Sequence, residues 1–478
     1  MSVRPLPSAA PAAQGVDASG VLAFLDALDA APDIEPHSLM ILRHGRLVAS
    51  GWWAPYTPER PQLLYSISKS FTATAAGIAA AEGLIRLDDP VISYFPEFEA
   101  DITDPRSRAM LVRHVASMAS GHESDTLFAA YGLDSEDLVR GFLLIPPPRD
   151  PGTVFAYNQS ATFTLSAIVQ RASGQSLTEY LRPRLLDPLG IGDIAWLSDR
   201  SGREFGFSGL HATTDAIARL GQLYLRGGVW EGERLLPEWW VAEATRAQIQ
   251  NAGVRPGEDW QRGYGFKFWM SRHGYRGDGA YGQFCLVLPE QDAVIATTAD
   301  TRNMQAVLNL VWEHLLPAFG PAPLTGGEAA DAALAKRLAD LALPPAAGKT
   351  APPERAEAWS AGAFTPDGGV CEHLPKLTAI DLAPGEDGWT LTLTEDGHPL
   401  RVRLGDAGWT VSDEPLPTAV SGGWTDPDTL VVDVAFLETP HHLDVTCSLK
   451  DRTFKASWRT EPLHHPPLRA MRAPRPSA

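Results

Sequence analysis

Residues 72–82 form the stretch that most limits what this chain can fold into. Apolar or small residues occupy nearly every position of TATAAGIAAAE, and no proline follows until Pro90. This composition favours a helix, and the lack of a polar face predicts that the helix is buried on most sides. The fold must therefore surround this helix, and a polar group at its start is held in an apolar setting.

Ser66 and Lys69 stand just before this run, in the sequence LYSISKSF. Residues three apart share a helix face, so we expect Ser66 at the helix mouth and Lys69 one turn deeper. A serine hydroxyl becomes a nucleophile when a base removes its proton, and an apolar setting lowers the pKa of a lysine enough for that role. The helix N-terminus would add N–H groups for an oxyanion. Serine is also a common helix cap and lysine a common surface residue, so the pair alone does not decide for catalysis.

Composition limits the size and the partners of the protein. Its 478 residues exceed one ordinary core, and a net charge of −18 argues against nucleic acid or an anionic membrane as a partner. Residues 1–16 lack the apolar stretch of a signal peptide, and no run approaches the roughly 20 apolar residues of a membrane helix. Three distant cysteines predict neither disulfides nor zinc, and the histidine doublets at 441–442 and 464–465 lack metal-ligand spacing. We expect a cytoplasmic protein without cofactor or metal, and a homo-oligomer stays open.

Four segments are expected along the chain. Residues 1–20 are predicted to be a flexible tail, 21–320 an α+β domain, 321–355 a linker rich in Ala, Gly and Pro, and 356–478 a small all-β domain. In the α+β domain, a hairpin at 37–51 and strands at 283–288 and 293–298 bracket the helices. This order predicts an antiparallel sheet built from both ends of the domain and flanked by helices, with an all-α region between. The strands expected in the last domain are 390–393, 400–404, 429–434, 443–449 and 454–458.

Tyr157 and Asn158 precede an expected helix at residues 161–172. A phenol there can share a proton with a lysine and later protonate a leaving group. Asn158 can hold the lysine or a substrate carbonyl. An aromatic staple followed by an Asn helix cap also explains the pair.

Residues 276–282, RGDGAYG, come directly before the strand at 283–288. The spacing of the three glycines matches a dinucleotide fingerprint, but a strand, a turn and a strand follow instead of a helix, which excludes that interpretation. Glycines beside a strand allow the close approach of a ligand or of another backbone. The N–H of Ala280 can then supply an oxyanion donor opposite that of Ser66.

With these motifs, residues 36–319 resemble the serine β-lactamase-related hydrolases: class C β-lactamases, DD-peptidases, family VIII esterases and the 6-aminohexanoate-dimer hydrolase. The matching parts are SISK, the tyrosine motif and the stretch 277–279, supported by LIRLDDPV, SGLHATTDAIARLGQLYL and YRGDGAYGQF. The resemblance implies a β-lactamase/DD-peptidase fold and an acyl-enzyme. The residues that it implies are the nucleophile Ser66, the general base and acid Lys69 and Tyr157, the oxyanion amides of Ser66 and Ala280, and the substrate-side residues Asn158, Asp278 and Gly279.

Two departures from the family pattern shape the expected function. The family's Tyr-x-Asn places its amide where Gln159 stands, so either Asn158 or Gln159 takes that role. Gly277 replaces the Lys or His that commonly faces a substrate carboxylate; Arg276 can substitute for it or pair with Asp278 on the same side of the strand. We therefore expect hydrolysis of a small-molecule ester or amide. The alternatives are a β-lactamase or D-amino-acid peptidase and, from another class, an inactive binding or scaffold protein with this fold.

Other residues carry weaker signals. His122 and Glu123 follow a helix stop and either border the cleft or cap the loop. His211 precedes a capping-type Thr-Thr-Asp and is expected to be structural. The aromatic residues at 260–269 form either core or an acyl-pocket wall.

Overall fold

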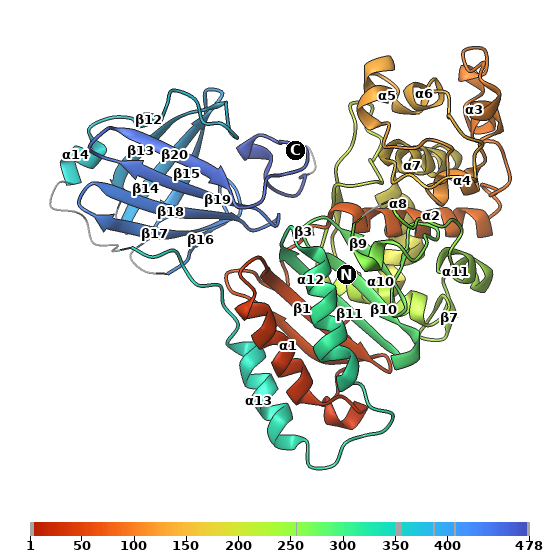
Figure 1. Ribbon diagram of the computed structural model, residues 1–478, viewed down its shortest axis with the longest axis horizontal. Helices are drawn as coiled ribbons and strands as arrows, with labels where there is room; N and C mark the ends of the chain where they lie inside the picture. Colours follow the sequence, from red (N-terminus) through yellow and green to blue (C-terminus); the bar gives the residue numbers. More distant parts are fainter. Residues whose placement is uncertain (1–3, 255, 349–355, 386–387, 406–407, 476–478) are drawn as a thin grey trace. The chain divides into compact units, whose positions relative to one another are not determined.

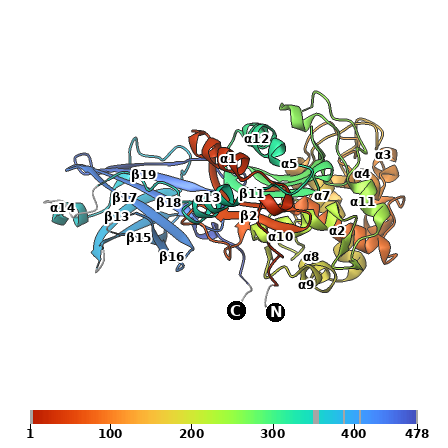
Figure 2. The same ribbon diagram turned by 90° about the horizontal axis from the view of Figure 1, so that it is seen from below.

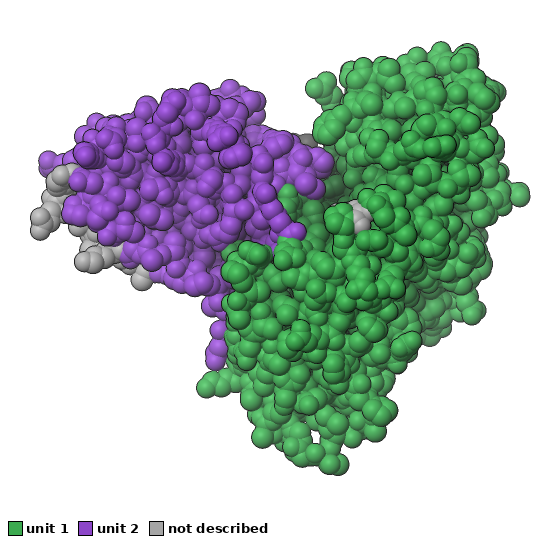
Figure 3. Space-filling model, viewed as in Figure 1, with its two compact units in different colours: residues 1–51, 64–299, 303–339 green, residues 52–63, 300–302, 340–478 purple. Residues whose placement is uncertain are grey.

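The computed structural model describes residues 4–254, 256–348, 356–385, 388–405 and 408–475. The chain forms two compact units (Figure 3): residues 1–51, 64–299 and 303–339 make the first, and residues 52–63, 300–302 and 340–478 make the second. Residues 1–3 of the expected tail and 349–355 of the expected linker lie outside the described residues. The domain boundaries expected from the sequence stay predictions. In the described part of the chain, no helix is long and apolar enough to cross a membrane.

A six-stranded sheet in the order β2-β1-β11-β10-β9-β8 forms the centre of the first unit. Strands from both ends of the unit meet where β1 lies beside β11, as the sequence predicts, and β8 to β11 pair antiparallel. Within the N-terminal segment, Pro7 and Ala9 exchange hydrogen bonds with Leu47 of β2, and Val16 is buried, so this part of the chain packs on the sheet. The strands are β1 (Glu35–Arg43), β2 (Arg46–Trp52), β8 (Trp269–Met270), β9 (Tyr275–Gly279), β10 (Gln283–Leu288) and β11 (Ala293–Asp300).

Helices cover both faces of this sheet (Figures 1 and 2). One face carries α1 (Ala18–Ala30) and α12 (Met304–Leu310), and α13 (Glu328–Ala339), within the expected linker, packs against α1. The other face carries α10 (Thr214–Leu225) and α2 (Ser68–Ala81). Every residue of α2 from its start through Ala79 is buried, which confirms the burial predicted from the alanine-rich run.

The all-α region packs around α7 (Gln159–Ser173), which contacts α2 along its length. Its start lies two residues before the one expected from the sequence. The helix α4 (Val112–Ala116) ends before Met118, whose φ of 61° is left-handed. The other helices of this region are α3 (Pro105–Ala109), α5 (Leu127–Leu133), α6 (Leu138–Leu143), α8 (Leu177–Leu181) and α9 (Asp187–Leu189).

The second unit is an all-β structure of a six-stranded sheet, β12-β20-β19-β18-β17-β16, and a three-stranded sheet, β13-β14-β15. Trp359, Trp389 and Trp424 pack together in its core. The five strands expected from the sequence are present, and β13 and β17 were missed because each contains a glycine pair or a Pro-Gly that signals a turn. The strands are β12 (Thr365–Pro366), β13 (Leu377–Gly385), β14 (Gly388–Glu395), β15 (His398–Leu404), β16 (Thr410–Ser412), β17 (Thr418–Asp426), β18 (Thr429–Phe436), β19 (His442–Ser448) and β20 (Thr453–Trp458).

Candidate active site

Ser66 lies in a 3-10 turn, Tyr65–Ile67, that leads into α2. The α-helix itself begins at Ser68, so Ser66 lies two residues before it, at the mouth of the helix. Tyr65 has a φ of 48°, a left-handed conformation that is unfavourable for an aromatic residue and recurs at functional sites. This turn leaves Ser66 half-buried, while the following residues enter the core.

Lys69 is buried against Ser66, with only 1% of its surface exposed. Its Nζ lies 2.8 Å from Ser66 Oγ and donates a hydrogen bond to the carbonyl of Phe207 at 2.7 Å. The Phe207 carbonyl fixes the direction of the amine. In the neutral form of the lysine, the lone pair can then accept the hydroxyl proton of Ser66. The sequence predicted Ser66 and Lys69 but gave no sign of the Phe207 carbonyl.

Tyr157 is the third residue, after Ser66 and Lys69, that the sequence analysis assigned to the site. Its ring centroid lies 4.7 Å from Lys69 Nζ. The ring stacks on Trp269 at 5.3 Å and meets Tyr264 edge-on at 6.2 Å. Trp269 and Tyr264 are buried, so these two aromatic residues belong to the core and hold the half-buried Tyr157 in place.

Ala280 follows β9 in the turn beside the Ser66 loop. Two of the three glycines expected just before a strand, Gly277 and Gly279, are in fact part of β9, which the sequence interpretation missed. A Cβ at Gly279 would lie 2.1 Å from the carbonyl oxygen of Leu64, so only glycine permits this approach of β9 to the chain before Ser66. Tyr281, with a φ of 68°, packs its ring edge-on against Tyr65 at 5.3 Å.

Arg276 and Asp278 pair with each other inside the unit. Arg276 Nη2 lies 3.1 Å from Asp278 Oδ2, and both side chains are buried. The guanidinium also lies 4.5 Å from the ring centroid of Trp260 and donates to the carbonyl of Asp259. The pairing expected as one alternative is therefore present, and Arg276 is held in the core.

Asn158 is fully buried at the start of α7. Its Oδ1 accepts hydrogen bonds from the Ser160 N–H and the Thr126 hydroxyl, each at 3.0 Å. The geometry is that of a helix cap, which was the alternative to a role at the lysine. Gln159 donates its N–H to Asp125, and its buried Oε1 has no hydrogen-bond partner among the described residues.

The two histidines of the first unit that the sequence analysis considered are structural. His122 is buried, and its ring nitrogens lie 3.0 Å from Ser120 Oγ and from the Ile145 carbonyl. Burial lowers its pKa. Burial also lowers the pKa of His211 to about 4, so this ring stays neutral.

A lysine that the sequence interpretation passed over also lies here. Lys267 is 2% exposed and donates from Nζ to the carbonyl of Val115 at 2.6 Å. Its signal was present in the sequence YGFKFWM, where a lysine stands between aromatic residues on both sides.

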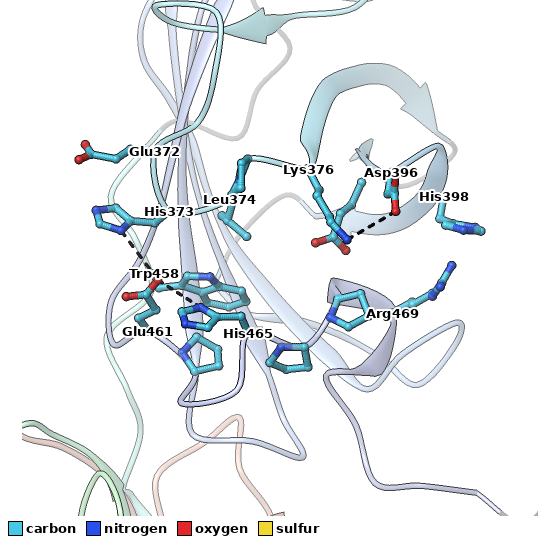
Figure 4. Close-up of a pocket in the computed structure, with 15 residues that line it drawn as sticks. Glu372, His373, Leu374, Lys376, Asp396, His398, Trp458, Glu461, His465 and Arg469 are labelled. Atoms are coloured by element: carbon cyan, nitrogen blue, oxygen red, sulfur yellow. Dashed lines mark ion pairs between the residues drawn. The ribbon is translucent and has the colours of Figure 1, made fainter. Parts of the chain in front are cut away.

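The second unit contains a separate cavity of about 410 Å³ (Figure 4). Its charged side chains face one another: Glu461 Oε1 lies 3.4 Å from His465 and 3.8 Å from His373, and Lys376 lies 3.7 Å from Asp396. Lys376 and Asp396 offset each other's charge at the wall of the cavity.

Comparison with known proteins identifies the family of this chain. Residues 23–313 match the β-lactamase family. The chain belongs to the β-lactamase family. It is therefore a serine hydrolase with the β-lactamase/DD-peptidase fold, as its resemblance implied.

Individual relatives agree with this assignment. The chain is 27% identical over 306 residues to the 6-aminohexanoate-dimer hydrolase of Paenarthrobacter ureafaciens, covering 57% of this chain and 77% of that protein. It is 28% identical over 159 residues to the esterase EstB of Burkholderia gladioli, covering 30% of this chain and 40% of EstB. A penicillin-binding protein homologue from Caulobacter crescentus superposes with a TM-score of 0.52 at 16% identity, covering 65% of this chain and all of that one. This last likeness concerns the fold.

Proposed function

We propose that this serine hydrolase cleaves an ester or amide bond of a small molecule through an acyl-enzyme on Ser66. The observation that carries the proposal is the 2.8 Å separation of Lys69 Nζ from Ser66 Oγ at a position where the lysine is almost wholly buried. Burial disfavours the ammonium form, and the neutral amine is the form that accepts a proton.

The reaction runs in two halves. Lys69 takes the Ser66 proton as Oγ attacks the substrate carbonyl carbon, and the amides of Ser66 and Ala280 stabilise the oxyanion. The C–O or C–N bond then breaks, and the leaving alcohol or amine receives the proton from Lys69 with the help of the Tyr157 phenol. Water attacks the acyl-enzyme while the same groups take and return its proton, which restores the Ser66 hydroxyl.

We favour an ester or amide substrate over a β-lactam because of the residues in β9. A β-lactam or peptide carries a carboxylate that needs a cation, but position 277 is glycine and Arg276 pairs with Asp278. The names of two relatives, a 6-aminohexanoate-dimer hydrolase and an esterase, support the same substrate class. The cytoplasmic location and any self-association stay predictions.

The test is intact-mass spectrometry after brief incubation with a p-nitrophenyl ester panel, with nitrocefin and with a fluorophosphonate. We expect an adduct on the peptide containing Ser66, release of p-nitrophenol and no opening of nitrocefin. Ser66→Ala should abolish labelling and turnover, whereas the control Ser135→Ala, at an exposed serine, should match the wild type. Rapid nitrocefin hydrolysis would instead identify a β-lactamase, and labelling of Ser66→Ala at the wild-type level would refute the nucleophile.

A further inference from the structure

The cavity of the second unit has the size of a small-molecule site. Its volume of about 410 Å³ lies within the usual range of such sites, roughly 300–1,000 Å³. Residues 372–376 and 395–398 form its first wall, and residues 461–469 form its second wall (Figure 4). Trp458, the last residue of β20, lies between the two walls. All the lining residues belong to the second unit, so this unit builds the cavity by itself.

Hydrogen bonds hold the two walls in place. The buried Glu395, at the end of β14, accepts the Leu468 N–H at 2.6 Å and so ties the second wall to this strand. The Lys376 carbonyl accepts the Asp396 N–H at 2.8 Å, which joins the two parts of the first wall. Three prolines also restrict the backbone of the second wall: Pro462, Pro466 and Pro467. The cavity is therefore formed before a ligand arrives, which lowers the entropic cost of binding.

Trp458 gives the cavity an aromatic surface. Its ring packs against Phe436, with the ring centroids 5.6 Å apart, and against His441 at 6.2 Å. These contacts hold the orientation of the indole, which is only partly buried and lines the cavity. The buried Leu374 and the prolines of the second wall add apolar surface around it. A ligand with one apolar face can therefore stack on Trp458.

The polar side chains of the cavity carry both signs of charge. The lining contains four carboxylates, one lysine, one arginine and three histidines. Lys376 Nζ lies 3.7 Å from Asp396 Oδ2, and Glu461 Oε1 lies 3.4 Å from His465 Nδ1. A ligand with a net charge would meet side chains of its own sign as well as of the opposite sign, and like charges brought together weaken binding. The cavity is therefore better suited to an uncharged ligand.

The same side chains keep hydrogen-bonding capacity that their pairing does not use. An ammonium group has several N–H donors and a carboxylate several acceptor sites, so the Lys376–Asp396 pair can still both donate and accept. Arg469, exposed on the second wall, adds the N–H donors of its guanidinium. A ligand that matches this lining has many groups that each donate and accept, together with one apolar face.

We propose that this cavity binds a neutral carbohydrate. A pyranose ring places its C–H face on the indole of Trp458. Its hydroxyls, each of which donates and accepts, bond to the carboxylates and the basic side chains of the two walls. The site does not depend on the proposed hydrolysis at Ser66, because the second unit alone supplies its residues.

Saturation-transfer-difference NMR on the full-length protein tests the proposal, with D-glucose, D-galactose and N-acetyl-D-glucosamine as probes and calorimetry for the Kd. We expect the ring C–H protons of the bound sugar to receive the strongest saturation. Arg469→Ala should raise the Kd roughly tenfold, because it removes hydrogen bonds from a charged donor. Trp458→Ala should remove the transfer to the C–H face. Arg401→Ala is the matched control, since Arg401 is exposed on β15 and does not line the cavity, and it should bind as the wild type does.

Two further comparisons identify the source and the class of the ligand. Because Trp458 also packs against Phe436, Glu461→Gln provides a second variant, at a partly exposed side chain, if Trp458→Ala does not fold. A disaccharide, maltose or chitobiose, that binds at least tenfold more tightly than its monosaccharide would identify a glycan chain, whereas equal affinities would identify a free sugar. Binding of adenosine or leucine in place of the sugars would overturn the carbohydrate class. No transfer to any sugar, or equal losses in Arg469→Ala and Arg401→Ala, would overturn the site.

Discussion

Gly279 shows how single positions control the site. Because a Cβ there would lie 2.1 Å from the Leu64 carbonyl, Gly279→Ala must move either the end of β9 or the chain that leads to Ser66. We expect a fall in kcat/KM of roughly tenfold or more, since small displacements of catalytic groups are costly, and a loss of about 1–3 kcal/mol in the free energy of unfolding from overpacking. Ester hydrolysis and urea denaturation measure the two effects.

Gly132→Ala is the matched control for this substitution. No atom lies within 4 Å of a Cβ built at Gly132, which is inside α5 and is not constrained to positive φ. Alanine should leave the activity unchanged and stabilise the protein by roughly 0.5–1 kcal/mol. Equal activities for the two variants would contradict the close packing of β9 against the Ser66 loop.

At this same scale, the sequence predicted the residues that combine chemistry with local spacing. Ser66 and Lys69 are three positions apart, so one turn brings them together whatever the rest of the chain does. Tyr157 required the family resemblance, because only the tertiary fold places its ring 4.7 Å from the amine. The contribution of Phe207 comes from its backbone carbonyl, which leaves no spacing pattern in the sequence.

At the scale of elements, the start of α7 depends on one side chain. Asn158 Oδ1 accepts the Ser160 N–H and also the Thr126 hydroxyl, so Asn158→Ala removes the helix cap and the tie to the 124–126 loop. We expect a loss of about 1–2 kcal/mol in the free energy of unfolding, measured by urea denaturation. Asn158→Asp keeps the acceptor oxygen and should therefore retain most of the stability that Asn158→Ala loses. If Asn158→Asp folds as well as wild type but loses most of its kcat/KM, Asn158 acts on substrate as the family pattern suggested.

Element prediction succeeded where periodicity and composition agreed. The alanine-rich run gave α2, and the apolar runs around 283–298 gave β10 and β11. It failed where a strand contains turn-forming residues, as in β9 with its Arg-Gly-Asp-Gly and β17 with its Gly-Gly. In β9 the glycines serve close packing against Leu64 and Ser70, a tertiary requirement that local propensity does not contain.

At the scale of the whole molecule, the second unit includes the segment 52–63, which leads to Ser66. Within this unit, the Ala54 N–H donates a hydrogen bond to the Leu341 carbonyl, and the Ala54 carbonyl accepts one from the Leu343 N–H. The Leu63 N–H donates to the Glu438 carbonyl at 2.9 Å. The chain then reaches Ser66 after two further residues. A sequence analysis that divides the chain into consecutive domains does not anticipate this, because 52–63 and 340–478 are far apart in sequence.

A buried network in the second unit also holds this segment. Asp433 lies 2.9 Å from His442 Nδ1 and 2.6 Å from Arg459 Nη2, and the Tyr56 hydroxyl lies 3.1 Å from His442 Nε2. Asp433→Asn removes the buried charge from this chain of contacts. We expect the free energy of unfolding to fall by about 2 kcal/mol. This is less than the full cost of breaking a buried ion pair, because the Arg459 side chain is 35% exposed.

Because the same network holds the segment before Ser66, Asp433→Asn should also lower the urea concentration at which ester hydrolysis is lost, although the substitution alters none of the residues to which we assign catalysis. Hydrogen-exchange mass spectrometry of β18 and β19 peptides, run in the same urea series, should show the β unit opening together with the loss of activity. Asp396→Asn is the control, since its ion pair with Lys376 is exposed and contributes at most about 1 kcal/mol. An activity midpoint that stays at the wild-type value while β18 and β19 open earlier would show that the nucleophile loop does not depend on the second unit.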